Sequence, residues 1–357
     1  MTTMNLFFSP IDVWLFRDGR PFDAGDDHYA RSLFPPYPSV MQGAIRSHHL
    51  VVKGIDLCNK QAIEQTVGTV DTFGSLRLRG PFMARRWSDG QITCYFPVPA
   101  DAVPCDAKYV KTAQAQSASA HRVITSVDEQ LSLLLFPYNI EPVKVDQSSW
   151  LSEKHLHDCL NGQKVEPLHA HELFLLEHRY GVGIETHTRT AREGLLYAAE
   201  FIRPQEGIGL YIEVTGYDSW PQRGVVRFGG ESRVARFEQV ERITWPVPPD
   251  PLPQRFKLYF ASPAYFAKGW QPDDWNKFFY GTVKLKAVAL KHYEIRGGFD
   301  LATGEQKPAR RFVPAGSVYY FEGNSEVRFR SDLIQHAITD YGAEIGFGQV
   351  IVAEWSL

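Results

Sequence analysis

Arginine is concentrated in short segments where it stands beside glycine or an aromatic residue. The sequence has 24 arginines against 14 lysines. A guanidinium group binds phosphate through paired hydrogen bonds and stacks on flat rings, which are the two contacts that unpaired RNA requires. The pattern therefore predicts RNA contact in this set. Its segments are FRDGRPF (16–22), LRLRG (76–80), ARRW (84–87), THTRTAR (186–192), RFGGESR (227–233) and PARRF (308–312).

Histidines suggest a second kind of chemistry. His155 and His157, and again His169 and His171, stand two residues apart beside an acidic residue, a spacing that can ligate a metal. Side chains two residues apart point the same way only in a strand, whereas residues 154–160 and 170–176 have helical patterns. The sequence therefore predicts surface histidines, with no metal and no cofactor.

His28 leads to an enzymatic alternative. It stands in DDHYARS, near Arg17 and Arg20. A histidine beside phosphate-binding arginines could act as the general acid or base of a metal-independent ribonuclease. The sequence contains no nucleophile elbow, phosphate-binding loop or dinucleotide fingerprint, so His28 is the single weak catalytic candidate.

Composition limits the class of protein. The chain has 357 residues, a net charge of -3 and a pI near 6.5, so a nucleic-acid site must be local. Its four cysteines form no CxxC pair, which fits a reducing cytoplasm. No apolar run is long enough to cross a bilayer, and the N-terminus lacks a basic leader region, so we expect a cytoplasmic protein.

The first 245 residues alternate strand patterns with one strong helix. We expect a strand at 11–16, a helix at 39–52 with Ser39 as its cap, and a hairpin at 75–99. Residues 101–120 are small and polar and predict a mobile loop, whereas 148–162 predicts a helix. A long hairpin at 178–204 has a polar tip at about 185–192 and should project. Strands are also expected at 207–214 and on both sides of the glycine pair in 224–240.

Five prolines in 245–254 predict a linker, at 246–254 between an N-terminal domain (1–245) and a C-terminal domain (255–357). Behind it, strands are expected at 255–266, 283–290, 316–323 and 348–355, with helices at 273–281 and 331–342. This β-α-β-β-α-β order is that of a ferredoxin-like domain. The segment GAEIGFGQV (342–350) supplies a glycine-rich loop before the last strand.

Several ordered motifs together resemble a known family, the third subunit of the Cmr-type (type III-B) CRISPR effector complex in the RAMP superfamily. The resemblance covers nearly the whole chain. It implies an α+β fold of two ferredoxin-like, RRM-related domains with insertions and a projecting β-hairpin thumb. The motifs are FRDGRPF, FPPYPSVMQGAIRS, GVGIETHTRTAREGLLY, RFGGESRV, KPARRFVPAGSVYYF and GFGQV.

The same resemblance implies a non-catalytic subunit that binds the repeat-derived 5′ handle of the crRNA. Its protein partners would be the large polymerase/cyclase-like subunit and the RAMP backbone subunit, in antiviral defence by RNA-guided target recognition. The alternative is a metal-independent RAMP endoribonuclease that processes CRISPR transcripts. The implied RNA-binding residues are Arg17, Arg20, Ser39, Gln42, Arg46, Gly183, Ile184, His187, Thr188, Arg189, Gly229, Gly230, Glu231, Arg233, Arg310 and Arg311, with Gly342, Gly346, Phe347 and Gly348 in the glycine-rich loop.

Two segments depart from the resemblance. Residues 103–145 and the histidine-rich block at 155–178 match none of its motifs. They are interpreted as insertions that contact the large subunit.

Overall fold

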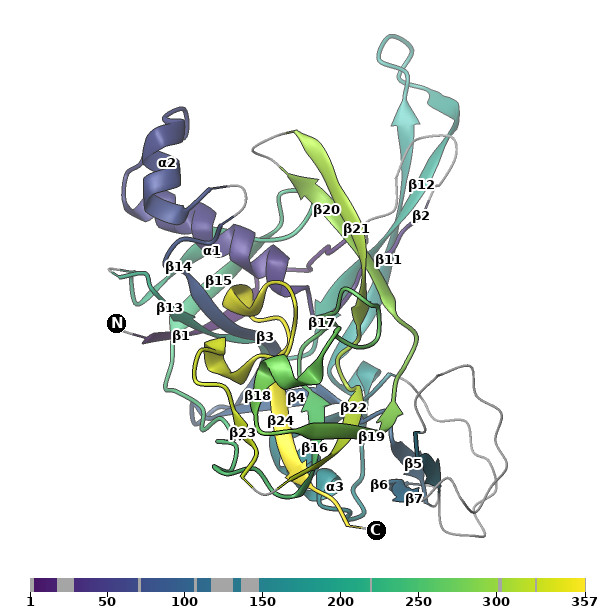
Figure 1. Ribbon diagram of the computed structural model, residues 1–357. Helices are drawn as coiled ribbons and strands as arrows, with labels where there is room; N and C mark the ends of the chain where they lie inside the picture. Colours follow the sequence, from purple (N-terminus) through teal and green to yellow (C-terminus); the bar gives the residue numbers. More distant parts are fainter. Residues whose placement is uncertain are drawn as a thin grey trace. The chain divides into compact units, whose positions relative to one another are not determined.

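The computed structural model describes residues 3–17, 29–69, 72–105, 108–116, 131–135, 148–218, 220–300, 304–324 and 326–356. The chain forms two compact units (Figure 1). Unit 1 comprises Met1–Ile92, Ala170–Arg242 and Ile295–Arg310, and unit 2 comprises Thr93–His169, Ile243–Glu294 and Arg311–Leu357. The division places 93–169 with the C-terminal strands. This division of the chain differs from the domain boundary expected at 246–254. The two domains expected at 1–245 and 255–357 therefore stay a prediction.

Five strands of unit 1 are hydrogen-bonded side by side in the order β14-β15-β1-β13-β3, as part of a sheet of eight described strands. Neighbouring strands are antiparallel. Numbered along the chain without the edge strand β14, the order is 4-1-3-2. The bounds are β1 (Thr3–Pro10), β3 (Arg77–Arg86), β13 (Ile208–Thr215), β14 (Arg223–Arg227) and β15 (Val234–Gln239).

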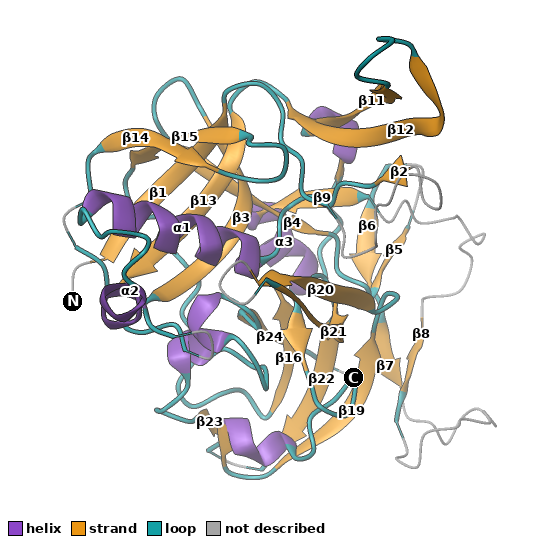
Figure 2. Cartoon of the chain, turned by 90° about the horizontal axis from the view of Figure 1, so that it is seen from above, coloured by secondary structure: helices purple, strands orange, loops and turns teal. Residues whose placement is uncertain are grey.

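Helix α1 (Pro38–Val52) lies across one face of this sheet, as Figure 2 shows. It buries Met41, Ile45 and other residues at helical spacing, which confirms the predicted helix. The helix starts one residue earlier than expected, with Tyr37 as N-cap and Pro38 in the first turn, so the assignment of Ser39 as the cap is wrong. The short helix α2 (Lys60–Val67) follows.

The strand expected at 11–16 is absent, because the N-terminal strand is β1, immediately before it. Residues Val13 to Phe16 are all buried, without the alternation of a one-sided strand. Trp14 instead exchanges two backbone hydrogen bonds with Ile202, at 2.9 and 2.8 Å. The segment thus crosses the base of the hairpin formed by β11 (Phe174–Ile184) and β12 (Ala191–Pro204), beside the short strand β2 (Tyr29–Ala30).

Unit 2 contains a four-stranded antiparallel sheet in the order β19-β22-β16-β24. Along the chain this order is again 4-1-3-2. Its strands are β16 (Arg255–Phe260), β19 (Val283–Ala289), β22 (Val318–Gly323) and β24 (Val350–Glu354), all four within segments predicted as strands.

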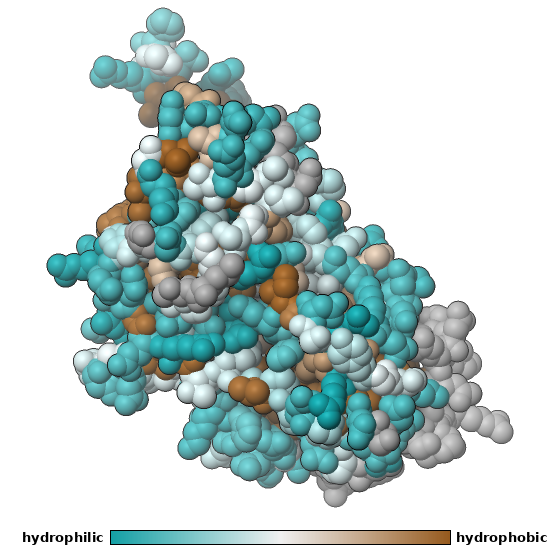
Figure 3. Space-filling model, turned by 60° about the vertical axis from the view of Figure 1, so that its left-hand side comes forward, coloured by the Kyte–Doolittle hydropathy of each residue, from teal (hydrophilic) through white to brown (hydrophobic). Residues whose placement is uncertain are grey.

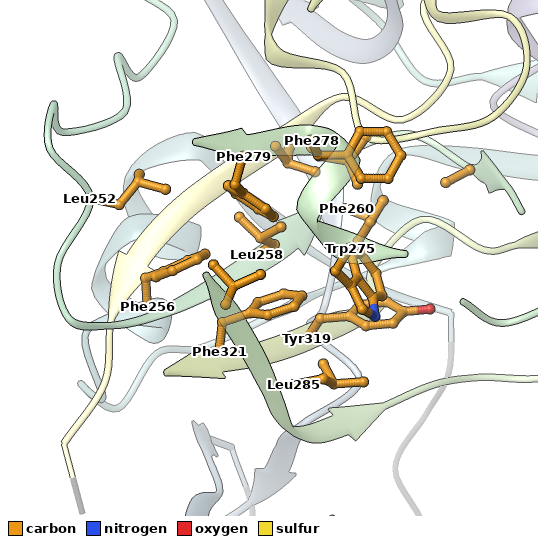
Figure 4. Packing of buried hydrophobic residues seen from close by; sticks show 14 of the residues in the cluster. Leu252, Phe256, Leu258, Phe260, Trp275, Phe278, Phe279, Leu285, Tyr319 and Phe321 are labelled. Carbon is orange, nitrogen blue, oxygen red and sulfur yellow. The ribbon is translucent and has the colours of Figure 1, made fainter. Parts of the chain in front are cut away.

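Aromatic residues fill the core of unit 2 (Figure 4). Trp275 lies edge-on to Phe321 with ring centroids 4.9 Å apart, and Phe256 stacks on Phe321 at 5.3 Å. Such pairs add roughly 0.5–1.5 kcal/mol to the burial of each ring. Trp275 reaches this core from a single 3-10 turn, η3 (Trp275–Phe278), at the place where a helix was expected.

The helix predicted at 331–342 is wrong. The segment holds one 3-10 turn, η4 (Ile334–His336), in which Gln335 and His336 have left-handed backbone angles. Ile338 is fully buried and its amide bonds to the carbonyl of Gly348. Tertiary packing against the glycine-rich loop thus overrides the helical pattern. A second 3-10 turn, η5 (Ala343–Ile345), follows.

The remainder of unit 2 combines short strands with helix α3 (Glu153–Leu160), which confirms a helix in 148–162. Of the stretch expected to be a loop, the described residues of 101–116 form three short strands. Most of 117–147 lies outside the described residues. The remaining strands are β4 (Ile92–Pro97), β5 (Ala102–Pro104), β6 (Val110–Thr112), β7 (Gln114–Gln116), β8 (Leu133–Leu135), β9 (Ser149–Ser152), β10 (Leu168–His169), β17 (Ala264–Tyr265), β18 (Phe279–Tyr280) and β23 (Arg328–Phe329).

Candidate nucleic-acid interface

Strands β11 and β12 form a long antiparallel ribbon, which Figure 1 shows extending well past the sheet strands of its unit. Pairing runs from Phe174 opposite Pro204 to Ile184 opposite Ala191. The tip is closed by backbone hydrogen bonds between Glu185 and Thr190 at 2.9 Å and between Arg189 and Glu185 at 2.8 Å. The predicted projecting hairpin is therefore confirmed as a structure. Gly183 and Ile184 end β11, and His187, Thr188 and Arg189 form the tip.

Glycines in the ribbon make room for side chains of the partner strand. A Cβ at Gly181 would overlap the ring of Tyr197, and one at Gly183 would lie 2.7 Å from the side chain of Leu195. Neither glycine has a positive φ, so glycine is needed here because a larger residue would not fit. The side chains of Tyr197 and Leu195 on β12 therefore pack over these two glycines.

One face of the ribbon exposes large apolar side chains. Tyr180 is 75% exposed, Ile184 62% and Leu196 61%, with Val182 beside them at 42%. Tyr180, Val182 and Ile184 alternate along β11, and Val182 pairs directly with Leu196, which places the four residues on one face. The pairing with β12 shifts register between Val182 and Ile184. We call them the apolar face. In Figure 3 the ribbon, at the top, ends in hydrophilic atoms with hydrophobic atoms directly below them. An exposed apolar surface of this kind is a candidate binding surface.

At the base of the same face, Tyr29 connects two titratable side chains. Its hydroxyl donates to Glu200 Oε2 at 2.8 Å and lies 3.0 Å from His178 Nδ1. Burial and the hydrogen bond to Glu200 raise the pKa of Tyr29 to about 12, so the phenol stays neutral. The Tyr29 and His178 rings stack at 6.0 Å, and Arg31 lies 5.8 Å from the Tyr29 ring. Flat rings beside a guanidinium are the surfaces on which unpaired bases stack.

The opposite face of the ribbon carries charges that are paired within the protein. Glu177 accepts from Arg203 Nε at 2.5 Å and from Arg179 Nε at 2.7 Å. Asp12 lies 3.2 Å from Arg179, 3.2 Å from Arg203 and 3.6 Å from Arg233. The guanidinium groups of Arg203 and Arg179 lower the pKa of Glu177, so its carboxylate stays charged. This face is directed to the body of unit 1.

The glycine pair of 227–233 packs on the segment that precedes the ribbon. The amide of Gly230 donates to the Leu15 carbonyl at 2.8 Å, and a Cβ at Gly229 would lie 2.7 Å from that oxygen. Glu231 has a left-handed backbone, and Arg233 joins Glu231 and Asp12. Close packing thus explains why glycine is required in this turn. The contact of these residues with RNA stays a prediction.

Helix α1 places Ser39, Gln42 and Arg46 on one side, three and four residues apart. Ser39 is exposed and Gln42 is buried. Arg46 donates to the carbonyls of Gly68 and Thr69 at 3.0 and 3.2 Å, which ties α1 to the end of α2. No local pattern in the sequence indicates this internal use of Arg46.

The segment FRDGRPF is described only at its start. Arg17 is exposed and forms a backbone bridge with Ser32. Arg20 and His28 lie outside the described residues, and the ribonuclease alternative that rests on them stays a prediction.

Arg310 and Arg311 lie on a second hairpin, made of β20 (Glu294–Asp300) and β21 (Glu305–Val313), which the sequence analysis missed. Arg311 is exposed and lies 5.0 Å from the ring of Tyr293, whereas Arg310 is partly buried. Glycines, a proline and charged residues hide the strand pattern here, since β21 is largely exposed up to Arg311 and shows no apolar alternation.

The glycine-rich loop is buried within unit 2. Gly342, Gly346 and Gly348 have positive φ angles and Phe347 stacks on Phe312 at 5.0 Å. A Cβ at Gly348 would lie 2.6 Å from the Ile338 carbonyl. Gly342 and Gly346 flank the 3-10 turn η5 with left-handed backbone angles, and close backbone packing accounts for Gly348.

The histidine-rich block forms no metal site among the described residues. His155 and His157 lie on α3, as predicted, but 170–176 is not a helix. It comprises the 3-10 turn η2 (Ala170–Glu172) and the start of β11. In the described part of the chain no helix is long and apolar enough to cross a membrane.

Comparisons with known proteins place the chain among CRISPR-associated proteins. A family model described as CRISPR-associated protein (Cas_Cmr3) matches residues 6–355. A chain of the type III-B Cmr-beta complex bound to cognate target RNA and AMPPnP is 17% identical, with 97% of this chain and 96% of that chain covered and a TM-score of 0.50. A second state, bound to cognate target RNA, gives 16% identity, the same coverage and a TM-score of 0.49. The Csm3-Csm4 subcomplex of a type III-A complex gives 14% identity over 99% of this chain and 100% of that chain, with a TM-score of 0.40. No curated protein matches the chain.

Proposed function

The chain belongs to the Cas_Cmr3 family of CRISPR-associated proteins, and on that premise we propose that it is a non-catalytic, RNA-binding subunit of a type III-B effector complex. In this proposal it holds the repeat-derived 5′ handle of the crRNA. It also links the large polymerase/cyclase-like subunit to the RAMP backbone, in RNA-guided antiviral defence.

The strand order of both sheets supports the proposed architecture. Each unit has an antiparallel 4-1-3-2 order, which is that of the ferredoxin-like fold. In unit 1 α1 occupies the first helical position, and the β14 hairpin stands in place of the second helix. In unit 2 the 3-10 turn η3 stands in place of the first helix, and the turns η4 and η5 stand in place of the second. We therefore interpret the units as two ferredoxin-like, RRM-related domains with insertions, and the ribbon as the thumb of the first.

The observation that carries the proposal is the apolar face of the ribbon with the Tyr29–His178 ring pair at its base. Unpaired bases stack on such surfaces without requiring a basic protein, which agrees with a net charge of -3. Exposed arginines at the tip, such as Arg189 and Arg192, are available for phosphates. RNA contacts are also proposed for Arg17, Ser39, Arg310 and Arg311, separately from the ribbon. Gln42 is buried, so its exposure gives no support to the contact proposed for it.

Binding of a synthetic crRNA handle, followed by fluorescence anisotropy, tests the proposal. We expect Tyr180→Ala to weaken binding about 5- to 150-fold, which corresponds to the roughly 1–3 kcal/mol of one base-aromatic stack. Tyr280 is a matched control because it is a tyrosine of unit 2 that is 45% exposed. Equal losses in Tyr180→Ala and Tyr280→Ala would contradict a stacking role for the ribbon.

The same preparations test the non-catalytic assignment. Repeat RNA incubated with the chain in chelator should stay intact. Specific cleavage that disappears in His28→Ala would overturn the proposal in favour of a metal-independent ribonuclease.

A further inference from the structure

Three arginines from three separate segments converge on one carboxylate. Arg179 comes from β11, Arg203 from β12 and Arg233 from the turn before β15, and each lies within 4 Å of an Asp12 oxygen. Asp12 itself belongs to the irregular segment between β1 and the ribbon. One side chain thus joins both ribbon strands to two loops of the body of unit 1.

An aromatic ring lies at the centre of this group. The guanidinium carbons of Arg179 and Arg233 each lie 4.7 Å from the centre of the Phe201 ring. Phe201 is 2% exposed and packs in a small core cluster with Val13 and Leu15. The arginines therefore cover the core beneath the ribbon as well as pairing with Asp12.

The charges of the group balance internally. Arg179, Arg203 and Arg233 are matched by Asp12, Glu177 and Glu231, all within ion-pair distance. An anion would have to displace the carboxylates that already form ion pairs with these guanidinium groups. This balance favours a clamp within the protein over a phosphate site.

Backbone contacts anchor one strand of the ribbon. Trp14 bonds to Ile202 of β12, and β2 pairs with Ala198 and Ala199 of the same strand. Strand β11 is tied to the body through its side chains, because Glu177 and Arg179 both belong to the ion-pair group. A two-stranded ribbon twists easily, so anchoring both strands at the base would limit its swing.

We propose that Asp12 is a positioning residue that fixes the direction of the ribbon. By clamping Arg179, Arg203 and Arg233 on one side, it directs the apolar face away from the body. Its effect on RNA binding rests on the proposed function, whereas its effect on the ribbon does not.

The proposal is tested first without RNA. Spin labels at Thr188→Cys on the tip and Val51→Cys on α1, in a background with Cys58→Ser and Cys105→Ser, report the ribbon's direction through their distance distribution. We expect Asp12→Ala to broaden the distribution, Arg233→Ala to do the same and Asp12→Glu to leave it narrow. The matched control is Asp273→Ala, which removes an exposed aspartate that pairs with Lys268 at 3.2 Å in unit 2. An unchanged distribution in Asp12→Ala would overturn the proposal.

Handle RNA gives the second reading. If the competent direction is populated about 10–20% of the time in Asp12→Ala, the apparent affinity falls about five- to tenfold, and Asp12→Glu restores it. An affinity that rises in Asp12→Ala would overturn the proposal, because Asp12 would then be masking a phosphate site. If the unaltered chain fails to bind the handle, the proposed function fails while the spin-label result still decides the role of Asp12.

Discussion

A buried ion pair in unit 2 permits a quantitative prediction. The ammonium group of Lys257 lies 3.7 Å from Asp101 Oδ2, and their side chains are 3% and 0% exposed. Tyr320 donates its hydroxyl to the same oxygen. Burial, and secondly the Asp101 charge, raise the pKa of Tyr320, so it stays a neutral donor. These contacts hold Asp101 against Lys257 of β16 and Tyr320 of β22.

Removing one member should be costly. Asp101→Asn leaves the Lys257 charge buried without its counter-charge. The free energy of unfolding should therefore fall by about 3–5 kcal/mol. Combining Asp101→Asn with Lys257→Met removes both charges. Replacing a buried ion pair by uncharged residues changes the free energy of unfolding little. We therefore expect the double variant to be more stable than Asp101→Asn, by about 2–4 kcal/mol.

Native-state hydrogen exchange of the β16 and β22 amides measures the effect, since it reports unit 2 separately from unit 1. As a control, Lys268→Ala breaks an exposed pair in the same unit and should cost less than about 1 kcal/mol. A cost below about 1 kcal/mol for Asp101→Asn, or a double variant whose loss equals the sum of the single losses, would refute the reasoning.

Three further results are expected. Burial lowers the pKa values of His48 and His49 in the folded chain. As the pH falls, the unfolded chain therefore binds protons at a higher pH than the folded chain does. The free energy of unfolding should be constant above about pH 6.5 and fall as the pH drops toward the lowered pKa values. Equal urea midpoints at about pH 7.5 and about pH 5.5 would contradict this, and His48→Gln with His49→Gln should remove the slope. Gly43 in α1 has open space at its Cβ position. Gly43→Ala should therefore stabilise the fold by about 0.5–1 kcal/mol and raise the thermal midpoint. A lower midpoint would show that this position does not tolerate a Cβ atom. Arg189→Ala should reduce the salt slope of handle binding by about 0.7 for each phosphate that the variant no longer neutralises, while an unchanged slope would exclude a phosphate contact there.

Local patterns predicted the elements that local forces determine. The hairpin at 178–204 and helix α1 follow from alternation and helical spacing, and both are confirmed. The predicted helix at 331–342 failed because Ile338 packs against Gly348, a contact that no local pattern encodes. The second hairpin, β20 and β21, was missed because most of β21 is exposed and carries no apolar alternation.

The candidate site was predicted only in part for the same reason. Arginine-bearing turns were identified by composition, but the structure uses Arg233 and Arg46 in contacts within the protein. Tyr29 and His178 are 149 residues apart, so their ring pair could not be found from spacing. The alternation of His178, Tyr180, Val182 and Ile184 was the one local signal that could have revealed the exposed face.

The central claim is that this chain holds the 5′ handle of a crRNA within a type III-B complex. The most direct measurement is to purify the tagged chain from its native host in mild salt, then identify the bound proteins by mass spectrometry and sequence the bound RNA. We expect to recover other Cmr subunits and RNAs that share one repeat-derived 5′ end. Recovery of the chain alone and free of RNA, or with RNAs of unrelated 5′ ends, would contradict it.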